Sequence, residues 1–537
     1  MKDEILPARI VCEGGLNTNE NSLVLSADLP GGAIKLINYE SSISGGYRRI
    51  NGYRLYDADV GPVGGANAEG KVLGLYNFYN SGSRVNEIYA ARKDISGDTY
   101  SIYKLIPGGW EAVTLPNPRT TVGANFNVVR LRFEVYNAGS GNNLFIVDGC
   151  NPLLWYNGTA WQEIEIEAQN TQVLKSPNVI AVFKNHLFVA CDQLDETVVA
   201  HSAPNDPSDW SSAGGSGQIY PGFEVQNIRP FRDELYVFGV SRIRKIIVDS
   251  TDFVLKDVTN DLGCIARDSI LEVGGNLLFL SQDGIRPVAG TDKISDVDLG
   301  LLSRDIQPDM DKLISEGDLE TLNGVVIKKK TQFRYFYANE AVVTNEAQGL
   351  IGCVTQNKRT GRDWEWSTLS GIRASCTWSG MVQGREIVLH GDFDGNVYQQ
   401  EQGSSFNGEP IYSLYQTPYL DFGNTEIRKT FRTMNLFMKN EGSSEIFLGY
   451  QFNWGDRDTI TPSNDLIDQN VNNFFFDRSN ATFDTPGVVY GGGELAKLMI
   501  NISGSGESIS FIFYSEGAFA PYTIQGFVVE YTERGRQ

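Results

Sequence analysis

Short apolar runs, each preceded by a few polar or glycine residues, recur along the middle of the chain. Each run holds four or five apolar residues and follows a turn-forming sequence such as Gly274-Gly275. This pattern is typical of a strand that is buried on both faces and is entered from a tight turn. The four clear copies are Asn143–Val147, His186–Ala190, Glu234–Phe238 and Asn276–Leu280, and their leading leucines are 43, 48 and 42 residues apart.

A repeat of this length predicts a β-propeller. A sheet of four short strands cannot cover its own apolar faces, so similar sheets stack around an axis and bury one another. Three weaker copies bring the total to seven, and we predict about six to eight blades, with seven as the best count. The weaker copies are Glu87–Ala90, Arg334–Tyr337 and Glu386–Leu389. No WD or kelch signature accompanies the repeats, so a series of unrelated β-hairpins in a large sandwich stays open as an alternative.

The first part of the chain, residues 1–60, differs from the repeats because it is polar and rich in turn signals. It contains a strand-like run at Leu23–Leu25, which Pro30 and the glycines after it separate from the next run. Asn51-Gly52 is a strong hairpin signal. We therefore predict an extended N-terminal arm that ends in a hairpin.

The rest of the chain divides into two further parts. Residues 61–410 carry the repeats and form the predicted propeller, interrupted by short helical turns at Leu301–Ile306 and Met310–Ile314. Residues 411–537 lose the spacing but keep alternating strands between glycine-rich turns, which predicts a C-terminal antiparallel β-sandwich-like domain. The predicted fold class is all-β.

Charge and composition narrow the range of functions. The 537-residue chain has 66 acidic and 45 basic residues and a net charge of -21, which argues against tight binding to a phosphate backbone or to an anionic membrane surface. Its six cysteines show no short spacing, so we expect free buried thiols in a reducing compartment. The N-terminus has no apolar segment of a signal peptide, and no apolar run reaches membrane length, so neither export nor membrane insertion is expected.

Few residues offer catalytic chemistry. The histidines, His186, His201 and His390, have no carboxylate or nucleophile at motif spacing, and we interpret them as surface turn residues. Asp392–Asn396 has the alternating oxygen ligands of a calcium loop but lacks its closing glutamate, so a hairpin turn explains it better. A propeller glycosidase would need two carboxylates beside the scissile bond, and no Asp-box or other motif marks such a pair. We therefore predict no catalytic, cofactor-binding or metal-binding residues, no cofactor, and a chain that is not an enzyme.

Several segments resemble the tail nozzle proteins of short-tailed bacteriophages (podoviruses), also known as packaged-DNA stabilisation or tail tubular proteins. The segments that resemble the opening of these proteins are Gly14–Leu16, Asn38–Glu40 and Gly46–Tyr53. Later segments similar to the same group are Val199–Trp210 and Thr417–Gly423 with Lys429. Together they cover the two ends and the middle of the chain.

The resemblance implies a structural virion protein whose copies form a ring, commonly a hexamer. The ring attaches below the portal and adaptor, closes the DNA channel to retain the packaged genome, and lets the genome pass during ejection. Implied partners are other copies of the chain, the adaptor (head-to-tail connector) protein, tail fibres or a tail needle, and genomic DNA that passes without tight binding. The implied location is the phage tail, assembled in the host cytoplasm, with residues 1–60 contacting the adaptor. Deletion of residues 1–45 is then expected to block incorporation into tails and leave a folded propeller.

Two alternatives from other functional classes stay open. One is a tail-associated carbohydrate-binding or glycoside-hydrolysing β-propeller, because propellers often host glycosidases. The other is an adhesin that binds host polysaccharide. A monomer that cleaves sugars would favour the first alternative over a ring-forming subunit.

Overall fold

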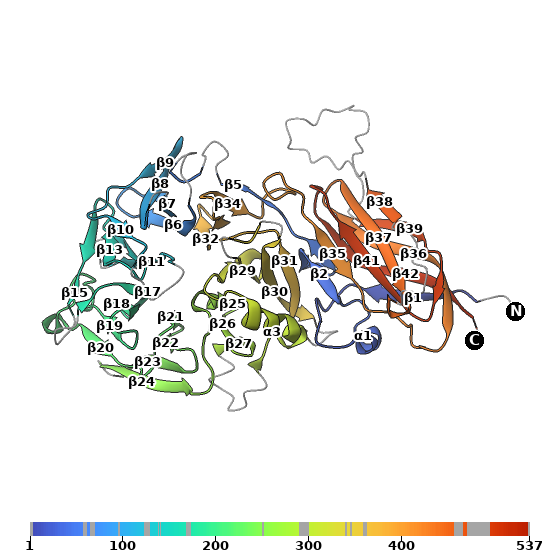
Figure 1. Cartoon of the computed structure of the whole chain (residues 1–537), viewed down its shortest axis with the longest axis horizontal. Helices are drawn as coiled ribbons and strands as arrows, with labels where there is room; N and C mark the ends of the chain where they lie inside the picture. The colour runs from blue at the N-terminus through green and yellow to red at the C-terminus, as the bar shows by residue number, and fades with distance from the viewer. Residues whose placement is uncertain are drawn as a thin grey trace.

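The structure, a computed structural model, describes residues 4–534 except 57–61, 65–69, 95–96, 123–128, 138, 140, 168–172, 250–251, 289–299, 339–340, 344–345, 358–361, 456–464 and 470–494. Strands make up most of this part of the chain. They form a propeller and, beside it, a sandwich of two sheets in which both termini lie (Figure 1). The fold is all-β, as the sequence predicts.

Seven sheets succeed one another around the propeller in the described residues, each a meander of antiparallel strands. The first strands of most neighbouring blades contact one another around the axis, an apolar cluster joins the fourth and fifth blades, and the last blade contacts the first. The first blade comprises β6 (Val72–Asn80), β7 (Val85–Lys93), β8 (Thr99–Ile106), β9 (Gly109–Ala112) and β10 (Arg119–Thr120). The second comprises β11 (Arg132–Asn137), β12 (Asn142–Val147), β13 (Leu153–Tyr156) and β14 (Trp161–Ile164). β15 (Ile166–Glu167) and β16 (Val173–Leu174) pair with each other between blades.

The next three blades follow the same plan. The third comprises β17 (Pro177–Phe183), β18 (His186–Asp192), β19 (Val199–His201) and β20 (Gly217–Ile219). The fourth comprises β21 (Asn227–Phe231), β22 (Glu234–Phe238), β23 (Ile243–Asp249) and β24 (Asp252–Thr259). The fifth comprises β25 (Leu271–Val273), β26 (Asn276–Ser281) and β27 (Gly284–Pro287). Short 3-10 turns are η1 (Ser212–Gly214) and η2 (Arg267–Ser269).

The last two blades connect the propeller to the rest of the chain. The sixth comprises β28 (Asn323–Ile327), β29 (Gln332–Tyr337), β30 (Gln348–Asn357) and β31 (Arg362–Ser370), with η5 (Lys328–Lys330) between its first two strands. The seventh comprises β32 (Cys376–Val382), β33 (Arg385–Gly391), β34 (Val397–Gln400) and, from the N-terminal segment, β5 (Tyr53–Leu55). Six of the sheets belong to the propeller alone, and the sixth blade is part of a longer sheet.

The repeated apolar runs of the sequence are the second strands of these blades: β7, β12, β18, β22, β26, β29 and β33. A second strand has a neighbour on each side within its sheet and a blade against each face, which explains its continuous apolar character. Apolar clusters fill the spaces between blades, such as the one that holds Phe78 and Ile146 between the first two. The propeller is therefore confirmed, and its blade count falls within the predicted range.

The sandwich consists of two sheets that take strands from both ends of the chain. One sheet has the order β3-β4-β42-β36-β39, with β1 paired to β42 and β40 to β36. The other continues from the sixth blade through β31-β2-β35-β41-β37-β38. Their bounds are β1 (Leu6–Val11), β2 (Lys35–Ile37), β3 (Tyr39–Ser41), β4 (Tyr47–Arg49), β35 (Ser413–Gln416), β36 (Arg428–Asn440), β37 (Ser444–Phe452), β38 (Asp465–Gln469), β39 (Leu495–Asn501), β40 (Ser505–Gly506), β41 (Ile509–Ser515) and β42 (Tyr522–Arg534), with η7 (Asn453–Gly455) after β37.

The N-terminal segment differs from the predicted arm, because its strands are built into both sheets of the sandwich and into the seventh blade. Asn51-Gly52 does not close a hairpin: β4 before it pairs with β42, and β5 after it pairs with β34. Leu23–Leu25 lies in helix α1 (Ser22–Asp28), which Asn21 caps through its side chain, and not in a strand. Deletion of residues 1–45 removes β1, β2 and β3, of which β2 pairs with β31 of the sixth blade, so we no longer expect the deletion to leave the propeller intact.

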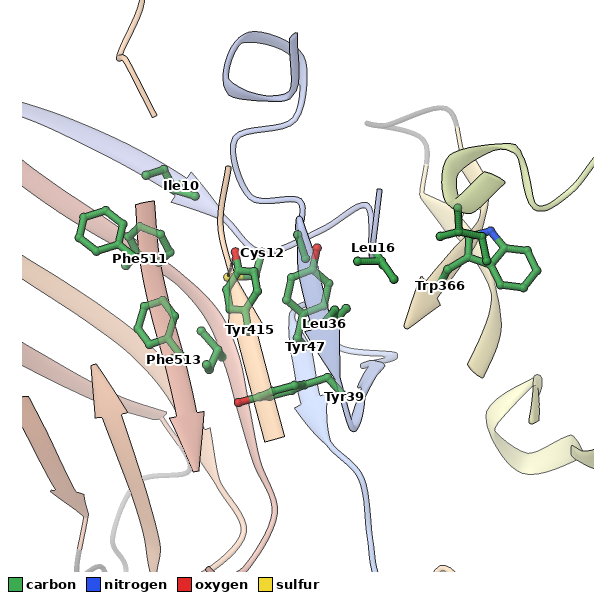
Figure 2. Packing of buried hydrophobic residues seen from close by; sticks show 14 of the residues in the cluster. Ile10, Cys12, Leu16, Leu36, Tyr39, Tyr47, Trp366, Tyr415, Phe511 and Phe513 are labelled. Atoms are coloured by element: carbon green, nitrogen blue, oxygen red, sulfur yellow. Dashed lines mark hydrogen bonds between the residues drawn. The ribbon is translucent and has the colours of Figure 1, made fainter. Parts of the chain in front are cut away.

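A single apolar cluster joins the sandwich to the propeller. It contains Phe511 and Phe513 of β41 together with Trp366 of β31, and Figure 2 shows the tyrosines of the N-terminal segment and β35 between them. The hydroxyl groups of Tyr47 and Tyr415 both donate to the carbonyl oxygen of Gly31, each at 3.0 Å. The predicted helical turns at 301–306 and 310–314 are also present, as η4 (Arg304–Ile306) and α3 (Gln307–Glu316), and α3 packs on this cluster.

Candidate functional site

A cavity of about 210 Å³ lies on the propeller axis. All seven blades line it, each through its first strand or through residues just before that strand. One lining residue from each blade, in blade order, is Tyr76, Arg132, Ile180, Arg229, Asp268, Asn323 and Trp378. The cavity is therefore a product of ring closure, and its polar groups come from distant parts of the sequence.

An ion triad holds one end of this cavity. Arg132 donates to both oxygens of the Asp268 carboxylate, from Nε at 3.0 Å and from Nη2 at 2.7 Å. Arg130 donates to the same carboxylate at 2.6 Å and to three backbone carbonyl oxygens, each at 3.1 Å. Burial alone would raise the pKa of Asp268, but the two guanidinium groups outweigh it and hold that pKa well below its usual range. Asp268 therefore remains a carboxylate and does not supply a proton near neutral pH.

The triad also separates two compartments of the axis. A second cavity, of about 240 Å³, is lined by the same three residues together with Arg267 and Glu320. Because Arg130, Arg132 and Asp268 belong to the walls of both cavities, their side chains stand between them. The triad thus forms a boundary that the two cavities share.

A second charged pair, Glu134 on β11 and Arg229 on β21, lies close to the cavity. Burial raises the pKa of the Glu134 carboxyl to about 7, and the positive charge of Arg229 opposes only part of this rise. Burial also lowers the pKa of Arg229. Among the residues that the structure describes, the Arg229 guanidinium makes no hydrogen bond, and its Nε is buried without a partner.

Aromatic side chains form another part of the cavity wall. The ring of Tyr76 stacks on Phe133, with centroids 5.3 Å apart and planes inclined by 15°. Trp378 meets Tyr76 edge-on at 6.3 Å. The cavity thus joins an apolar surface with convergent charged groups, which is the usual composition of a small-molecule site.

The raised pKa of Glu134 predicts a measurable dependence of stability on pH. Between the usual glutamate pKa of about 4.3 and the folded value of about 7, the folded chain binds a proton that the unfolded chain has lost, so stability falls as the pH rises. Glu134→Gln is expected to remove this slope. Urea midpoints of both proteins at pH 5.0, 6.0 and 7.5 measure it; parallel profiles would contradict the assignment.

The rings of His186 and His201 pack edge to face with centroids 5.0 Å apart, His390 lies in another blade, and two of the three histidines are not surface turn residues. His201 and His390 are buried, so that prediction is wrong for both. Burial lowers the pKa of His390 to about 3. The error arises because both lie at the ends of blade strands that neighbouring aromatic rings cover, such as Tyr53 and Tyr398 around His390. His186 is half-buried, and its Nδ1 lies 2.7 Å from the carbonyl oxygen of Ser202.

The segment Asp392–Asn396 forms the turn between β33 and β34, as expected for a hairpin. Asp392 Oδ1 accepts hydrogen bonds from the backbone N–H groups of Asp394 at 2.9 Å and Asn396 at 2.7 Å. Within the described ranges, no group of three or more histidine, cysteine or acidic side chains is placed to hold a metal ion. No helix in those ranges has the length and apolar character needed to cross a membrane.

The axial residues were missed by sequence reasoning, because one or two polar residues per blade carry no spacing signal. The one local signal is Arg130-Leu131-Arg132, which places two arginines on alternate positions next to a blade's first strand. Their shared partner, Asp268, is 136 residues from Arg132. Only the closed ring brings these groups together.

The N-terminal segments that carry the family resemblance meet elsewhere, where the propeller joins the sandwich, whereas Val199–Trp210 begins with β19 of the third blade. The Asn38 side chain donates to the carbonyl oxygens of Ser370 and Tyr412, at 2.9 and 2.7 Å, and so ties the sixth blade to the strand before β35. Arg49 is fully buried and donates to backbone carbonyl groups at Ile411, Gly517 and Phe519. These residues position chain segments and have no free reactive group.

Glu40, at the same junction, anchors a buried ion network. Its carboxylate accepts from Arg48 at 2.8 Å and from Lys330 at 2.6 and 2.9 Å. Arg334 lies 3.4 Å from it and also donates to Glu401 at 2.5 Å. The network joins the N-terminal segment to the sixth and seventh blades.

Comparison with known proteins finds no matching family model and no matching curated protein. Solved structures do match, among them exo-beta-1,3-galactanase from Phanerochaete chrysosporium with galactose, at 11% identity and a TM-score of 0.23. This match covers 89% of the present chain and 100% of the other. A variant of the same enzyme with beta-1,3-galactotriose matches at 10% identity and a TM-score of 0.24, over 90% of this chain and 99% of the other.

The expectation that the chain is not an enzyme is contradicted by this finding, because both matching structures are enzymes. That expectation is therefore not retained. The low identity and TM-scores carry no argument about which ligand or reaction belongs to this chain. Those questions depend on its own residues and on experiment.

Proposed function

We propose that the chain is a subunit of a ring-shaped tail nozzle of a short-tailed bacteriophage, attached below the portal and adaptor. The observation that carries the proposal is the convergence of the N-terminal family-like segments on one junction. Asn38, Glu40 and Arg49 all hold the propeller against the sandwich there. A subunit of a conduit under internal pressure needs such a stiff connection between domains, and buried, hydrogen-bonded charges supply it.

In this proposal DNA passes through the lumen of the ring and not through the propeller of one subunit. The triad of Arg130, Arg132 and Asp268 lies on the wall of the axial cavity, and that cavity holds only about 210 Å³. The chain's net charge of -21 suits a lumen that DNA crosses without adhering, because contacts that release counterions are what hold DNA. Copies of this chain, the adaptor and fibres or a needle are the proposed partners.

The test is genetic and structural in the phage that carries the gene. A nonsense mutation is expected to give heads that package DNA and then lose it, and complementation with the intact gene restores filled particles. Gold-labelled antibodies against the protein are expected at the tail. Filled, infectious particles that lack the protein would refute the proposal.

A second candidate function is carbohydrate recognition in the axial cavity. The observation that favours it is the wall of Tyr76, Phe133 and Trp378 beside the charged groups of Arg229 and Glu134. Aromatic rings cover the apolar face of a ligand while charged groups fix its orientation. If the site hydrolyses glycosides, Glu134 is the group able to donate a proton, since the Asp268 carboxylate is held by two arginines.

An oligosaccharide panel that includes beta-1,3-galactotriose tests this candidate directly. Binding measured by calorimetry and reducing-end release measured over a day distinguish recognition from turnover. Turnover that Glu134→Gln abolishes would establish an enzyme. Failure to bind any glycan would remove the candidate and leave the nozzle proposal untouched.

A further inference from the structure

We propose that the axial cavity binds a small carboxylated ligand, of the class of uronic acid sugars, through the guanidinium of Arg229. The inference rests on the second candidate function and names its ligand class. It does not depend on ring assembly.

The charge around the axis is the first reason. Four arginines, Arg130, Arg132, Arg229 and Arg267, lie on the walls of the two axial cavities. Asp268 lies on both walls and Glu320 on the second, while Glu134 interacts with Arg229 and Glu196 with Arg267, so each arginine has a carboxyl group near it. The carboxyl group beside Arg229 is only partly ionised near neutral pH, because burial raises the pKa of Glu134 to about 7, and the positive charge of Arg229 therefore favours an anion beside it.

The availability of hydrogen-bond donors is the second reason. The Nη groups of Arg130 and Arg132 donate hydrogen bonds to Asp268 and to backbone or side-chain oxygens of neighbouring blades. Arg229, in contrast, makes no hydrogen bond to any residue that the structure describes, and its buried Nε has no partner. A buried donor without an acceptor is costly, so a ligand oxygen at this position would be stabilising.

The number of guanidinium groups without a hydrogen-bond partner among the described residues indicates which kind of anion fits the cavity. One planar guanidinium presents two parallel N–H groups that match the two oxygens of a carboxylate. The cavity offers this one fork, because its other two arginines, Arg130 and Arg132, already bind Asp268. A dianionic phosphate would leave oxygens without donors, so a carboxylate fits better.

The aromatic residues of the cavity indicate which kind of molecule carries the carboxylate. Tyr76 and Trp378 belong to the first and seventh blades, which lie across the ring from the fourth blade and Arg229. A ligand between them has an apolar face at one end and a negative charge at the other. A cavity of about 210 Å³ suits one small ring of this kind.

The test compares three probes, D-glucuronate, D-glucose and inorganic phosphate, by isothermal titration calorimetry on the full chain. Glucuronate is expected to bind more tightly than glucose or phosphate. Arg229→Gln is expected to weaken glucuronate binding by about 10- to 100-fold, as for a lost charge-assisted pair. Arg242→Gln, an exposed arginine of the same blade, is the matched control and is expected to bind as the parent does.

Thermal melting of both variants shows whether each is folded before binding is measured. Equal binding of glucuronate by the parent and Arg229→Gln overturns the inference. So does glucose or phosphate binding as tight as that of glucuronate, although glucose binding leaves carbohydrate recognition in place. Absence of binding by any sugar removes both the inference and the second candidate.

Discussion

Gly52→Ala is expected to open the propeller ring and to lower the free energy of unfolding by about 3 kcal/mol. A Cβ atom at residue 52 would lie 1.9 Å from the carbonyl oxygen of Ser405, and backbone atoms cannot rotate away as a side chain can. The backbone N–H of Gly52 also donates to the carbonyl oxygen of Gly403 at 3.0 Å. The clash therefore pushes away the segment that leads directly into β5.

The consequence is large because β5 closes the ring. It is the only strand of the seventh blade that comes from the N-terminal end of the described chain, and it pairs with β34 from Tyr53 to Leu55. Without it, the last blade loses its outer strand and Tyr53, which stacks on Phe406. Hydrogen exchange is then expected to rise selectively in β34 and β5.

The control is Gly97→Ala, on a turn of the first blade. There the nearest atom to a new Cβ is Thr99 Oγ1 at 3.8 Å, an ordinary contact. Its urea midpoint is expected to match the parent's. If Gly52→Ala also unfolded at the parent's midpoint with unchanged exchange in β34, the proposed role of β5 would be wrong.

The contrast between Gly52 and the repeats explains which features the sequence can predict. Each second strand of a blade is buried on both faces by local rules of strand packing, so its apolar run appears in the sequence wherever it occurs. Short strands such as β2 and β5 have three residues each and carry no such pattern. Their partners are more than 300 residues away, so the Asn51-Gly52 pair looked like a local hairpin when it is a close approach between distant backbones.

The candidate site was less predictable than the fold for a related reason. Its groups lie one or two to a blade, and arginine and aspartate at a blade's first strand are also ordinary surface residues in a sequence. Only the closure of seven blades places Arg229 opposite Tyr76 and removes both from bulk water. For the histidines, the sequence predicted too much exposure. The turn-forming residues after His390 suggested a surface position, but its ring is buried and stacks on Tyr398.

Glu40→Gln is expected to have the largest effect of any single charge change, lowering the free energy of unfolding by about 3–5 kcal/mol. Glu40 is only 3% exposed and is in contact with Arg48, Lys330 and Arg334. These three cations are balanced by three carboxylates, of which the other two are Glu401 and Glu441. Removal of one carboxylate leaves a buried positive charge uncompensated.

A control variant and a double variant test whether the uncompensated charge, and not the substitution as such, causes the loss of stability. Asp233→Asn breaks an exposed pair with Lys184 and is expected to change stability by less than about 0.5 kcal/mol. Glu40→Gln combined with Lys330→Met restores the charge balance and is expected to recover part of the loss, because a balanced apolar replacement costs less than a broken buried pair. Urea denaturation of the single and double variants measures the coupling between the two sites.

The position of the ion network also predicts which part of the Glu40→Gln variant unfolds first. The network joins the N-terminal segment, the sixth and seventh blades and, through Glu441, the sandwich, so its loss is expected to separate the domains before either one unfolds. Limited proteolysis of Glu40→Gln should then cut between β34 and β35 while leaving the propeller blades intact. Loss of the blades at the same rate as that segment would show that the network stabilises the whole fold and not the junction, and would remove the physical basis for a stiff connection in a conduit.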